Sequence, residues 1–236
     1  RRVLFRSFLQ FSGWIHIIRP YTKLYNKNQN FKKEVLLMET KVLEKREIGD
    51  PAIAITFFFT LITILFWGMF QGIFKDNAIF IVGLTQLDCF PGYIICSIIY
   101  FVRGDALYGS LYMIFATLFA GVGGLANIAI YVGTLNGWGL DGSVSSMAFL
   151  WGGLALIPVC IVKRKEPILP LSMFVVATLF LIGYPLIVLG YLPLTLMVVM
   201  KWMALWIAVD GLYSLMSGLL MLGGCKGLPM GPSIIK

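Results

Sequence analysis

Six apolar stretches account for most of the chain beyond residue 50. They run over 52–74, 78–102, 106–133, 145–162, 168–191 and 194–222. Each is near the ~20 residues that a helix needs to cross a hydrocarbon core about 30 Å thick. The pattern therefore predicts an all-α integral membrane protein in which six transmembrane helices form one bundle. The short loops between the stretches indicate that neighbouring helices run antiparallel.

Positive charge alternates between present and absent in successive loops. One side carries Lys41, Lys45, Arg46, Arg103, Lys163, Arg164, Lys165, Lys226 and Lys236, whereas the loops of the other side carry Lys75 alone. Cytoplasmic loops hold the excess of Lys and Arg in membrane proteins. We therefore expect both the N- and the C-terminus in the cytoplasm and the bundle in the plasma or inner membrane of a cell.

Composition supports a membrane protein and excludes most other classes. Apolar residues make up 59% of the chain, and the mean hydropathy is +0.88; both values lie far outside the range of soluble domains. The formal net charge of +8 belongs to residues 1–37, because their removal leaves 11 basic against 10 acidic residues. The charge therefore gives no reason to expect a nucleic-acid partner.

The basic tail, residues 1–37, lacks the layout of a signal peptide. Its Lys32-Lys33-Glu34-Val35 run can be encoded by a purine-rich stretch that resembles a bacterial ribosome-binding site, and Met38 follows at a suitable distance. We expect translation to start at Met38; the alternative is a basic arm that contacts anionic lipid. The expected division is an untranslated or disordered tail over 1–37, a cytoplasmic segment over 38–50, the transmembrane domain over 51–223 and a cytoplasmic tail over 224–236.

Polar side chains gather on one face of two of the stretches. They are Thr56, Thr60, Thr63, Trp67 and Gln71 on the first, and Trp206, Asp210, Ser214 and Ser217, with Tyr213 alongside, on the sixth. Because lipid offers these groups no partners, the two faces are expected to turn inward. They indicate a narrow permeation path, or alternatively interhelical hydrogen bonds that hold the bundle together.

Three ionisable residues fall within the apolar stretches: Asp88, Asp210 and Lys201. Acids at this depth are costly and usually functional, so Asp210 and Asp88 are candidate proton-responsive groups. A capped structural acid is the alternative for Asp210. Pro91, close behind Asp88, is expected to break or kink the second stretch.

Catalytic and metal-binding motifs are absent from the sequence. The only histidine, His16, lies in the basic tail, and the four cysteines have no metal-ligand spacing. We therefore expect no enzyme activity, no cofactor and no metal site.

Short motifs at the ends of the stretches resemble those of the acetate/succinate uptake transporter family (the AceTr or YaaH group). Asp50-Pro51-Ala52 stands where that family has Asn-Pro-Ala, and Arg103-Gly104-Asp105 follows the second stretch. Leu150-Trp151-Gly152 and Leu228-Pro229-Met230-Gly231 complete the ordered set, which covers residues 50–231.

The resemblance implies a homo-oligomer, typically a hexamer, with a separate anion path through each protomer. It places a constriction at Phe59, Phe115 and Ala177, where the family has an aromatic residue, a tyrosine and a large aliphatic residue. It also implies a substrate path along Asp50, Thr56, Thr60, Thr63, Tyr213 and Ser214.

The sequence therefore predicts a channel or proton-coupled transporter for acetate-like or succinate-like carboxylates. Two alternatives remain open at this point. One is a urea/amide channel of the AmiS/UreI type, which also has six helices; the other is a membrane subunit that does not transport.

Overall fold

A computed structural model describes residues 32–34, 49–75 and 77–235 of the chain. Residues 32–34 are helical and belong to a separate unit, Arg1–Gly49. The expected tail over 1–37 and start at Met38 lie otherwise outside the described residues. The second unit, which begins at Asp50, contains the helical bundle.

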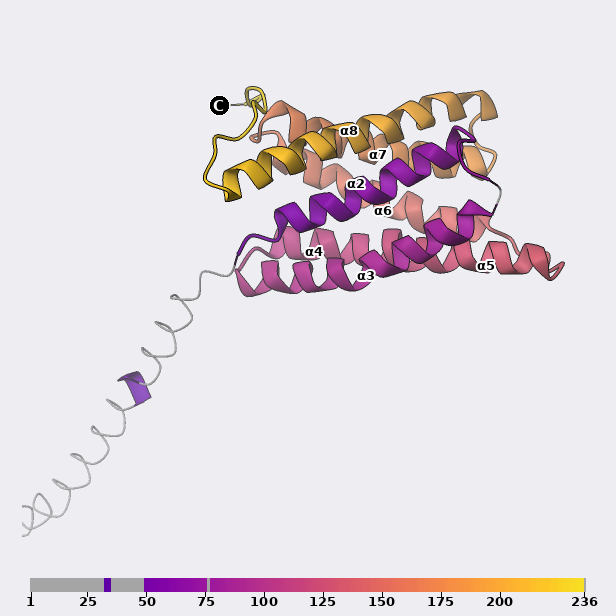
Figure 1. Cartoon of the computed structure of the whole chain (residues 1–236), viewed down its shortest axis with the longest axis horizontal. Coiled ribbons are helices and arrows are strands. Elements are labelled where there is room, and N and C mark those ends of the chain that lie inside the picture. Colours follow the sequence, from indigo (N-terminus) through magenta and orange to yellow (C-terminus); the bar gives the residue numbers. More distant parts are fainter. Residues whose placement is uncertain (1–31, 35–48, 76, 236) are drawn as a thin grey trace, which may run out of the picture. The chain divides into compact units, whose positions relative to one another are not determined.

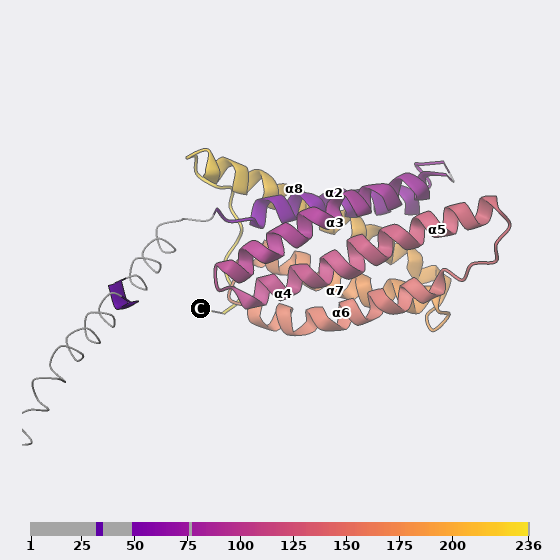
Figure 2. The same cartoon turned by 90° about the horizontal axis from the view of Figure 1, so that it is seen from below.

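The bundle consists of long helices that follow one another antiparallel (Figures 1 and 2). They are α2 (Ala52–Phe70), α3 (Ala78–Val102), a third helix made of α4 (Ala106–Ile114), the π-helix η1 (Phe115–Val122) and α5 (Gly123–Leu135), then α6 (Ser143–Lys163), α7 (Ile168–Val188), and η2 (Leu194–Leu196) leading into α8 (Met197–Leu222). Within the described residues, six helices are long and apolar enough to cross a membrane. For the described residues, the predicted all-α architecture with six helices long and apolar enough to span a membrane is confirmed.

Two of the predicted stretches are longer than the helices that they form. The first was expected to reach residue 74 and the fifth residue 191, but α2 ends at Phe70 and α7 at Val188. Gly72 and Gly190 have φ values of 69° and 79°, and a residue in this left-handed conformation closes a helix. A prediction from hydropathy alone counts the apolar residues that follow such a glycine as part of the helix.

Of the two outcomes expected for Pro91, a break or a kink, the break is wrong, because α3 continues through Pro91 to Val102. Ending a helix within a bilayer would leave several backbone groups without partners. Pro91 removes the hydrogen bond of one backbone amide, which is the smaller cost.

The antiparallel order brings the basic loops together at one end of the bundle. We call this the basic end: α2, α4 and α7 begin there, and α3, α6 and α8 end there (Figure 1). It carries Arg103, Arg164, Lys165 and Lys226, whereas the loops at the opposite end carry Lys75.

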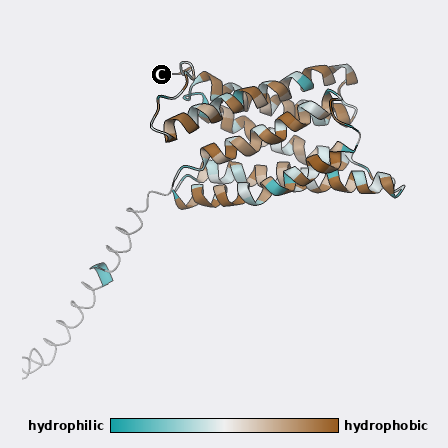
Figure 3. Cartoon of the chain, in the orientation of Figure 1, coloured by the Kyte–Doolittle hydropathy of each residue, from teal (hydrophilic) through white to brown (hydrophobic). Residues whose placement is uncertain are grey.

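The helices are hydrophobic along most of their length (Figure 3), and many of their large apolar side chains are exposed. Ile95, Trp151 and Leu219 are each more than half exposed. Such a surface would promote association in water but suits a hydrocarbon environment. The side chains therefore agree with helix length and hydropathy in indicating a multi-pass membrane protein.

Small residues let the helix backbones approach closely at Gly83, Gly124 and Gly153. A Cβ atom at Gly124 would lie 2.8 Å from the carbonyl oxygen of Gly83, and one at Gly83 would lie 2.8 Å from that of Gly124. At Gly153 a Cβ would meet the backbone of α7 at Leu181, 2.9 Å away. Packing in bilayers depends on such close approaches.

Gly83→Ala is expected to lower the thermal midpoint of the detergent-purified protein. The new methyl group would force α3 and α5 apart, and overpacking of this kind costs about 1–3 kcal/mol. Gly139→Ala is the matched control, because nothing lies within 4 Å of a Cβ at that position. Equal thermal midpoints for the two variants would contradict the close packing of α3 on α5.

Candidate functional site

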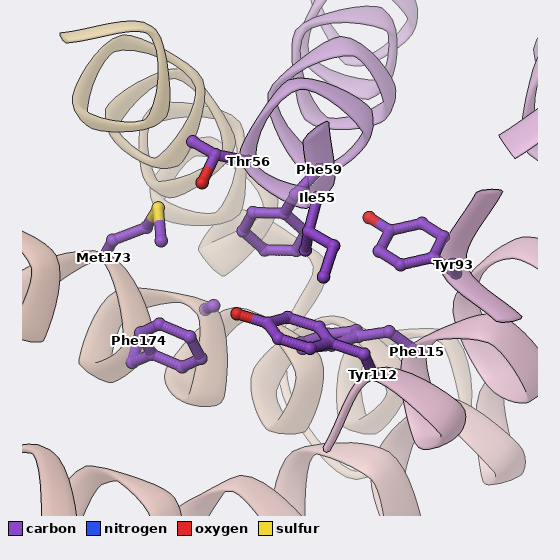
Figure 4. A pocket seen from close by; sticks show the side chains of 9 residues that line it. Ile55, Thr56, Phe59, Tyr93, Tyr112, Phe115, Met173 and Phe174 are labelled. Atoms are coloured by element: carbon purple, nitrogen blue, oxygen red, sulfur yellow. The ribbon is translucent and has the colours of Figure 1, made fainter. Parts of the chain in front are cut away.

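One small cavity brings together the three residues expected at the constriction. Phe59 of α2, Phe115 of η1 and Ala177 of α7 all line it, together with Ile55, Thr56, Tyr93, Tyr112, Met173 and Phe174 (Figure 4). Its volume is about 20 Å³, which is room for about one water molecule. The Phe59 and Phe115 ring centres are 5.4 Å apart.

A layer of aromatic rings separates this cavity from the opposite end of the bundle. Phe119 lies 5.7 Å from Phe59 and 5.9 Å from Phe66, measured between ring centres. Beyond these rings lies a second cavity of about 290 Å³, which Phe66 and Phe119 also line. Its wall includes polar side chains from three positions at the start of α6 and one on α5: Ser143, Ser145, Ser146 and Asn127. This second cavity, the wide chamber, thus lies on one side of the rings and the small cavity on the other.

Three hydroxyl groups occur among the residues of the small cavity. Figure 4 shows the hydroxyls of Tyr93 and Tyr112 directed towards the space between the rings. Thr56 already donates to the carbonyl oxygen of Ala52 at 2.8 Å. The buried Tyr93 hydroxyl has no hydrogen-bond partner in the described part of the chain. A buried donor without an acceptor is costly, so the cavity favours an occupant that offers an acceptor oxygen.

The π-helix η1 carries two of the constriction rings, and a buried glutamine fixes it. Gln86 of α3, which is fully buried, donates from Nε2 to the carbonyl oxygen of Phe119 at 2.6 Å. Asn127 donates to Gln86 Oε1 at 2.7 Å. Single π-helical turns within α-helices occur frequently at functional sites. Gln86 therefore ties the backbone of η1 at Phe119 to α3.

A cluster of tyrosines continues from the small cavity to the basic end. Tyr112 stacks on Tyr108 and Tyr100 with ring centres 6.0 and 5.4 Å apart. Tyr108 donates a hydrogen bond to Glu166, and Lys163 Nζ donates to both the Tyr108 hydroxyl and Glu166. Polar groups thus follow the apolar constriction on this side as well.

Asp50 lies at the basic end and is paired. Its Oδ1 accepts from the amide of Ala52 at 3.1 Å and from the Tyr100 hydroxyl at 3.0 Å, and Arg103 Nη1 lies 3.1 Å away. These contacts offset the negative charge of Asp50. The carboxylate is therefore not an isolated charge at the basic end.

The threonines of α2 point in different directions. Thr56 lines the small cavity, whereas Thr63 donates to the carbonyl oxygen of Phe59 at 2.8 Å. A Cβ at Gly211 would lie against Thr60 Oγ1, which places Thr60 in the contact with α8. The predicted polar face is therefore divided between the cavity and helix packing.

The polar residues expected on the sixth helix lie outside the walls of the small cavity. Asp210 is buried between α7 and α8, where its Oδ2 accepts from Ser172 at 2.7 Å. Tyr213 donates to the carbonyl oxygen of Pro229 at 3.0 Å, and Ser214 Oγ is buried without a partner in the described part of the chain. Tyr213 thus holds the C-terminal segment.

The C-terminal segment is docked on the basic end. Ser217 accepts from the amide of Leu228, and the amide of Leu169 donates to the carbonyl oxygen of Met230. Gly231 has φ +81°, and a Cβ there would lie against Ile168. The Leu-Pro-Met-Gly motif, residues 228–231, therefore has a structural role, because it packs across the start of α7.

Asp88 lies on the outward face of α3, away from both cavities. Its neighbours along that face, Leu84 and Ile95, are 43% and 58% exposed. Asp88 makes no ion pair with any described residue. Lipid supplies no partner for a carboxylate at this depth, which makes the position of Asp88 costly.

The sequence did not assign Tyr93, Tyr112, Gln86 or Lys163 to the candidate site. Two signals could have found three of them. Gln86, Cys89, Tyr93, Cys96 and Tyr100 recur at helical spacing and are all buried, and Tyr108, Tyr112, Phe115 and Phe119 form an aromatic stripe at steps of 4, 3 and 4. Lys163 gave no signal, because it lies in a run of basic residues of the kind that marks a cytoplasmic loop.

Comparison with the models of known protein families gives no match, and comparison with curated protein sequences gives none either.

Proposed function

We propose that the protein is a transporter or channel for small carboxylates of the acetate or succinate class. The observation that carries this proposal is the small cavity, in which an apolar constriction adjoins the unpartnered hydroxyl of Tyr93. A carboxyl oxygen is the acceptor that this hydroxyl lacks. Three of the nine residues that line the small cavity, Phe59, Phe115 and Ala177, are those that the resemblance to the acetate/succinate transporters places at a constriction.

The constriction favours a proton-coupled or pH-dependent process. Moving a bare carboxylate between the rings of Phe59, Phe115 and Phe119 strips it of water, which costs far more than moving the neutral acid. The fraction of neutral acid rises as the pH falls. We therefore expect the flux of acetate to be larger at acid pH.

The distribution of Lys and Arg supports an orientation for the process. The basic end carries nearly all the loop cations, and positive loops face the cytoplasm. We infer that both termini are cytoplasmic, that the wide chamber opens to the exterior, and that the bundle lies in the plasma or inner membrane.

The urea/amide channel is the second candidate. The polar wall of the wide chamber, with three serines and Asn127, offers donors and acceptors that suit a neutral amide. The paired cations and carboxylates at the basic end favour a charged substrate instead. Carboxylate transport therefore remains the leading function.

Uptake of labelled acetate, succinate and urea into proteoliposomes distinguishes these functions. The proposal predicts acetate or succinate uptake above that of protein-free vesicles, with a higher rate at pH 5.5 than at pH 7.5. Uptake of urea without uptake of acetate or succinate would indicate a urea/amide channel instead. A lack of uptake for all three would favour a membrane subunit that does not transport.

The outward carboxylate of Asp88 supports a homo-oligomer, which the resemblance implies to be a hexamer. Lipid cannot solvate this group, whereas an interface with a second protomer can supply a hydrogen-bond donor or a cation. We propose that the α3 face around Asp88 lies in that interface.

Asp88→Leu is expected to weaken assembly, because it removes the polar contact while leaving the protomer's own hydrogen bonds unchanged. Native mass spectrometry of the detergent-purified protein should show the oligomer shifting towards smaller species. Asp141→Leu, at an exposed acid in the loop before α6, is the control and should assemble as the wild type does. An intact oligomer in Asp88→Leu would remove this face from the interface.

A further inference from the structure

Lys163 is buried although it belongs to a run of basic residues at the end of α6. It is 5% exposed, whereas its neighbours Arg164 and Lys165 are exposed. Lysine is almost never fully buried unless it is paired. Its position therefore differs from that of the cations beside it.

The ammonium group of Lys163 lies next to the small cavity. Its Nζ is 4.4 Å from the centre of the Phe174 ring and 4.7 Å from that of the Tyr108 ring. Phe174 lines the small cavity. The thickness of one aromatic side chain therefore separates this cation from the constriction.

Lys163 and Tyr108 together hold a carboxylate by both oxygens. Lys163 Nζ donates to Glu166 Oε2 at 2.7 Å, and the Tyr108 hydroxyl donates to Oε1. Lys163 Nζ also donates to the Tyr108 hydroxyl at 2.8 Å, so the two donors are fixed relative to each other. Two donors, one of them charged, form a strong site for any carboxylate. We call these two side chains the carboxylate clamp.

The occupant of the carboxylate clamp is less constrained than its donors. The side chain of Glu166 is 34% exposed, whereas that of Lys163 is 6% exposed. Glu166 can therefore swing into water, where its charge is solvated at little cost. Lys163 has no such alternative and, once Glu166 leaves, requires another anion.

We propose that the carboxylate clamp is a substrate-binding site at the basic end of the path, in which Glu166 takes the place of the substrate carboxylate. A carboxylate that passes the constriction meets Lys163 and Tyr108 and displaces Glu166. The return of the Glu166 side chain releases the substrate, so the carboxylate clamp does not hold the substrate too tightly for transport. This inference rests on the proposed function for its substrate, but its central claim is the binding of a carboxylate.

Glu166→Ala tests the claim by emptying the carboxylate clamp. The variant leaves the buried cation of Lys163 without its counter-ion and is expected to have a lower thermal midpoint than the wild type. Millimolar acetate should restore this midpoint in Glu166→Ala, whereas chloride at the same concentration should restore it far less. Wild-type protein should respond weakly to acetate, because Glu166 already fills the site.

The double variant Glu166→Ala/Lys163→Gln removes the cation and should lose the stabilisation by acetate. Glu166→Ala/Lys165→Gln is the matched control, since Lys165 is exposed, and should keep it. Glu166→Gln keeps a side chain of the same shape and replaces Glu166→Ala in this test if the alanine variant does not fold. For Glu166→Gln, the acetate concentration that gives half-maximal stabilisation should be about tenfold lower than for the wild type.

The two proposals can fail separately. Stabilisation of Glu166→Ala by acetate without any uptake in proteoliposomes would support the carboxylate clamp and overturn the transport function. Acetate uptake by the wild type, combined with no stabilisation of Glu166→Ala or Glu166→Gln, would overturn the clamp. Equal stabilisation of the two double variants would also overturn it, because Lys163 would then have no part in binding.

Discussion

Ala177→Trp is expected to reduce acetate uptake at least about tenfold, a barrier increase of about 1.4 kcal/mol or more. Ala177 faces Phe59 and Phe115 across a cavity of about 20 Å³, and an indole ring is several times larger than this space. The substituted side chain would fill the constriction and leave no passage between α2, η1 and α7. Overpacking costs about 1–3 kcal/mol of stability, occasionally more, so folding and assembly of the variant are measured alongside its flux.

Val175→Trp is the control for this prediction. Val175 lies on the same helix, is 39% exposed and faces outward, so the same bulky residue there is expected to leave the flux unchanged. Size-exclusion profiles of both variants in detergent show whether they assemble as the wild type does. Undiminished acetate flux through a well-assembled Ala177→Trp protein would remove Ala177 from the path.

Gln86→Leu is expected to lower both stability and the selectivity of the constriction. The change leaves the carbonyl of Phe119 without its side-chain donor and the amide of Asn127 without its acceptor. Each buried group that loses its partner costs about 1–3 kcal/mol. Because η1 would no longer be tied to α3, the rings of Phe115 and Phe119 would lose their fixed position. We expect a lower thermal midpoint and a smaller ratio of acetate to succinate uptake.

Thr117→Val provides the matched control within η1. Thr117 is exposed and donates to the carbonyl oxygen of Met113 on its own helix, so its replacement leaves the contact with α3 in place. Its thermal midpoint and substrate ratio should match those of the wild type. A Gln86→Leu protein that behaves like Thr117→Val would show that Gln86 does not position the constriction.

Hydropathy and residue spacing were sufficient to predict the six helices, because the cost of exposing backbone groups to lipid permits little else. They were not sufficient at the helix ends, where the φ values of Gly72 and Gly190 close α2 and α7 before the apolar residues run out. They also gave no sign of the π-helix, which depends on the packing of α3 against the third helix.

The candidate site was only partly accessible from the sequence. Phe59, Phe115 and Ala177 were identified through the resemblance, and they line one cavity. A polar stripe in the sequence, by contrast, does not show whether its residues line a permeation path or contact other parts of the protein. Thr56 lines the cavity, but Thr63 donates a hydrogen bond to its own helix and Thr60 packs on α8. The burial of Lys163 arises from partners on α4 and beyond the end of α6, which no local pattern reveals.

Together these features arrange polar and apolar layers along the bundle. The wide chamber, the aromatic constriction and the carboxylate clamp follow one another from the opposite end to the basic end. A small acid would lose water at the rings and regain polar contacts at the hydroxyls of the cavity and then at Lys163. The arrangement suits passage, because the rings and the cavity offer few contacts and Glu166 competes with the substrate for the carboxylate clamp.

The most direct test of this account is the initial rate of labelled acetate uptake at pH 5.5 into proteoliposomes that contain either the wild type or Ala177→Trp. The account predicts uptake by the wild type well above that of protein-free vesicles and uptake by Ala177→Trp close to that background. Wild-type uptake no greater than that of protein-free vesicles, in a preparation with correctly inserted protein, would contradict it.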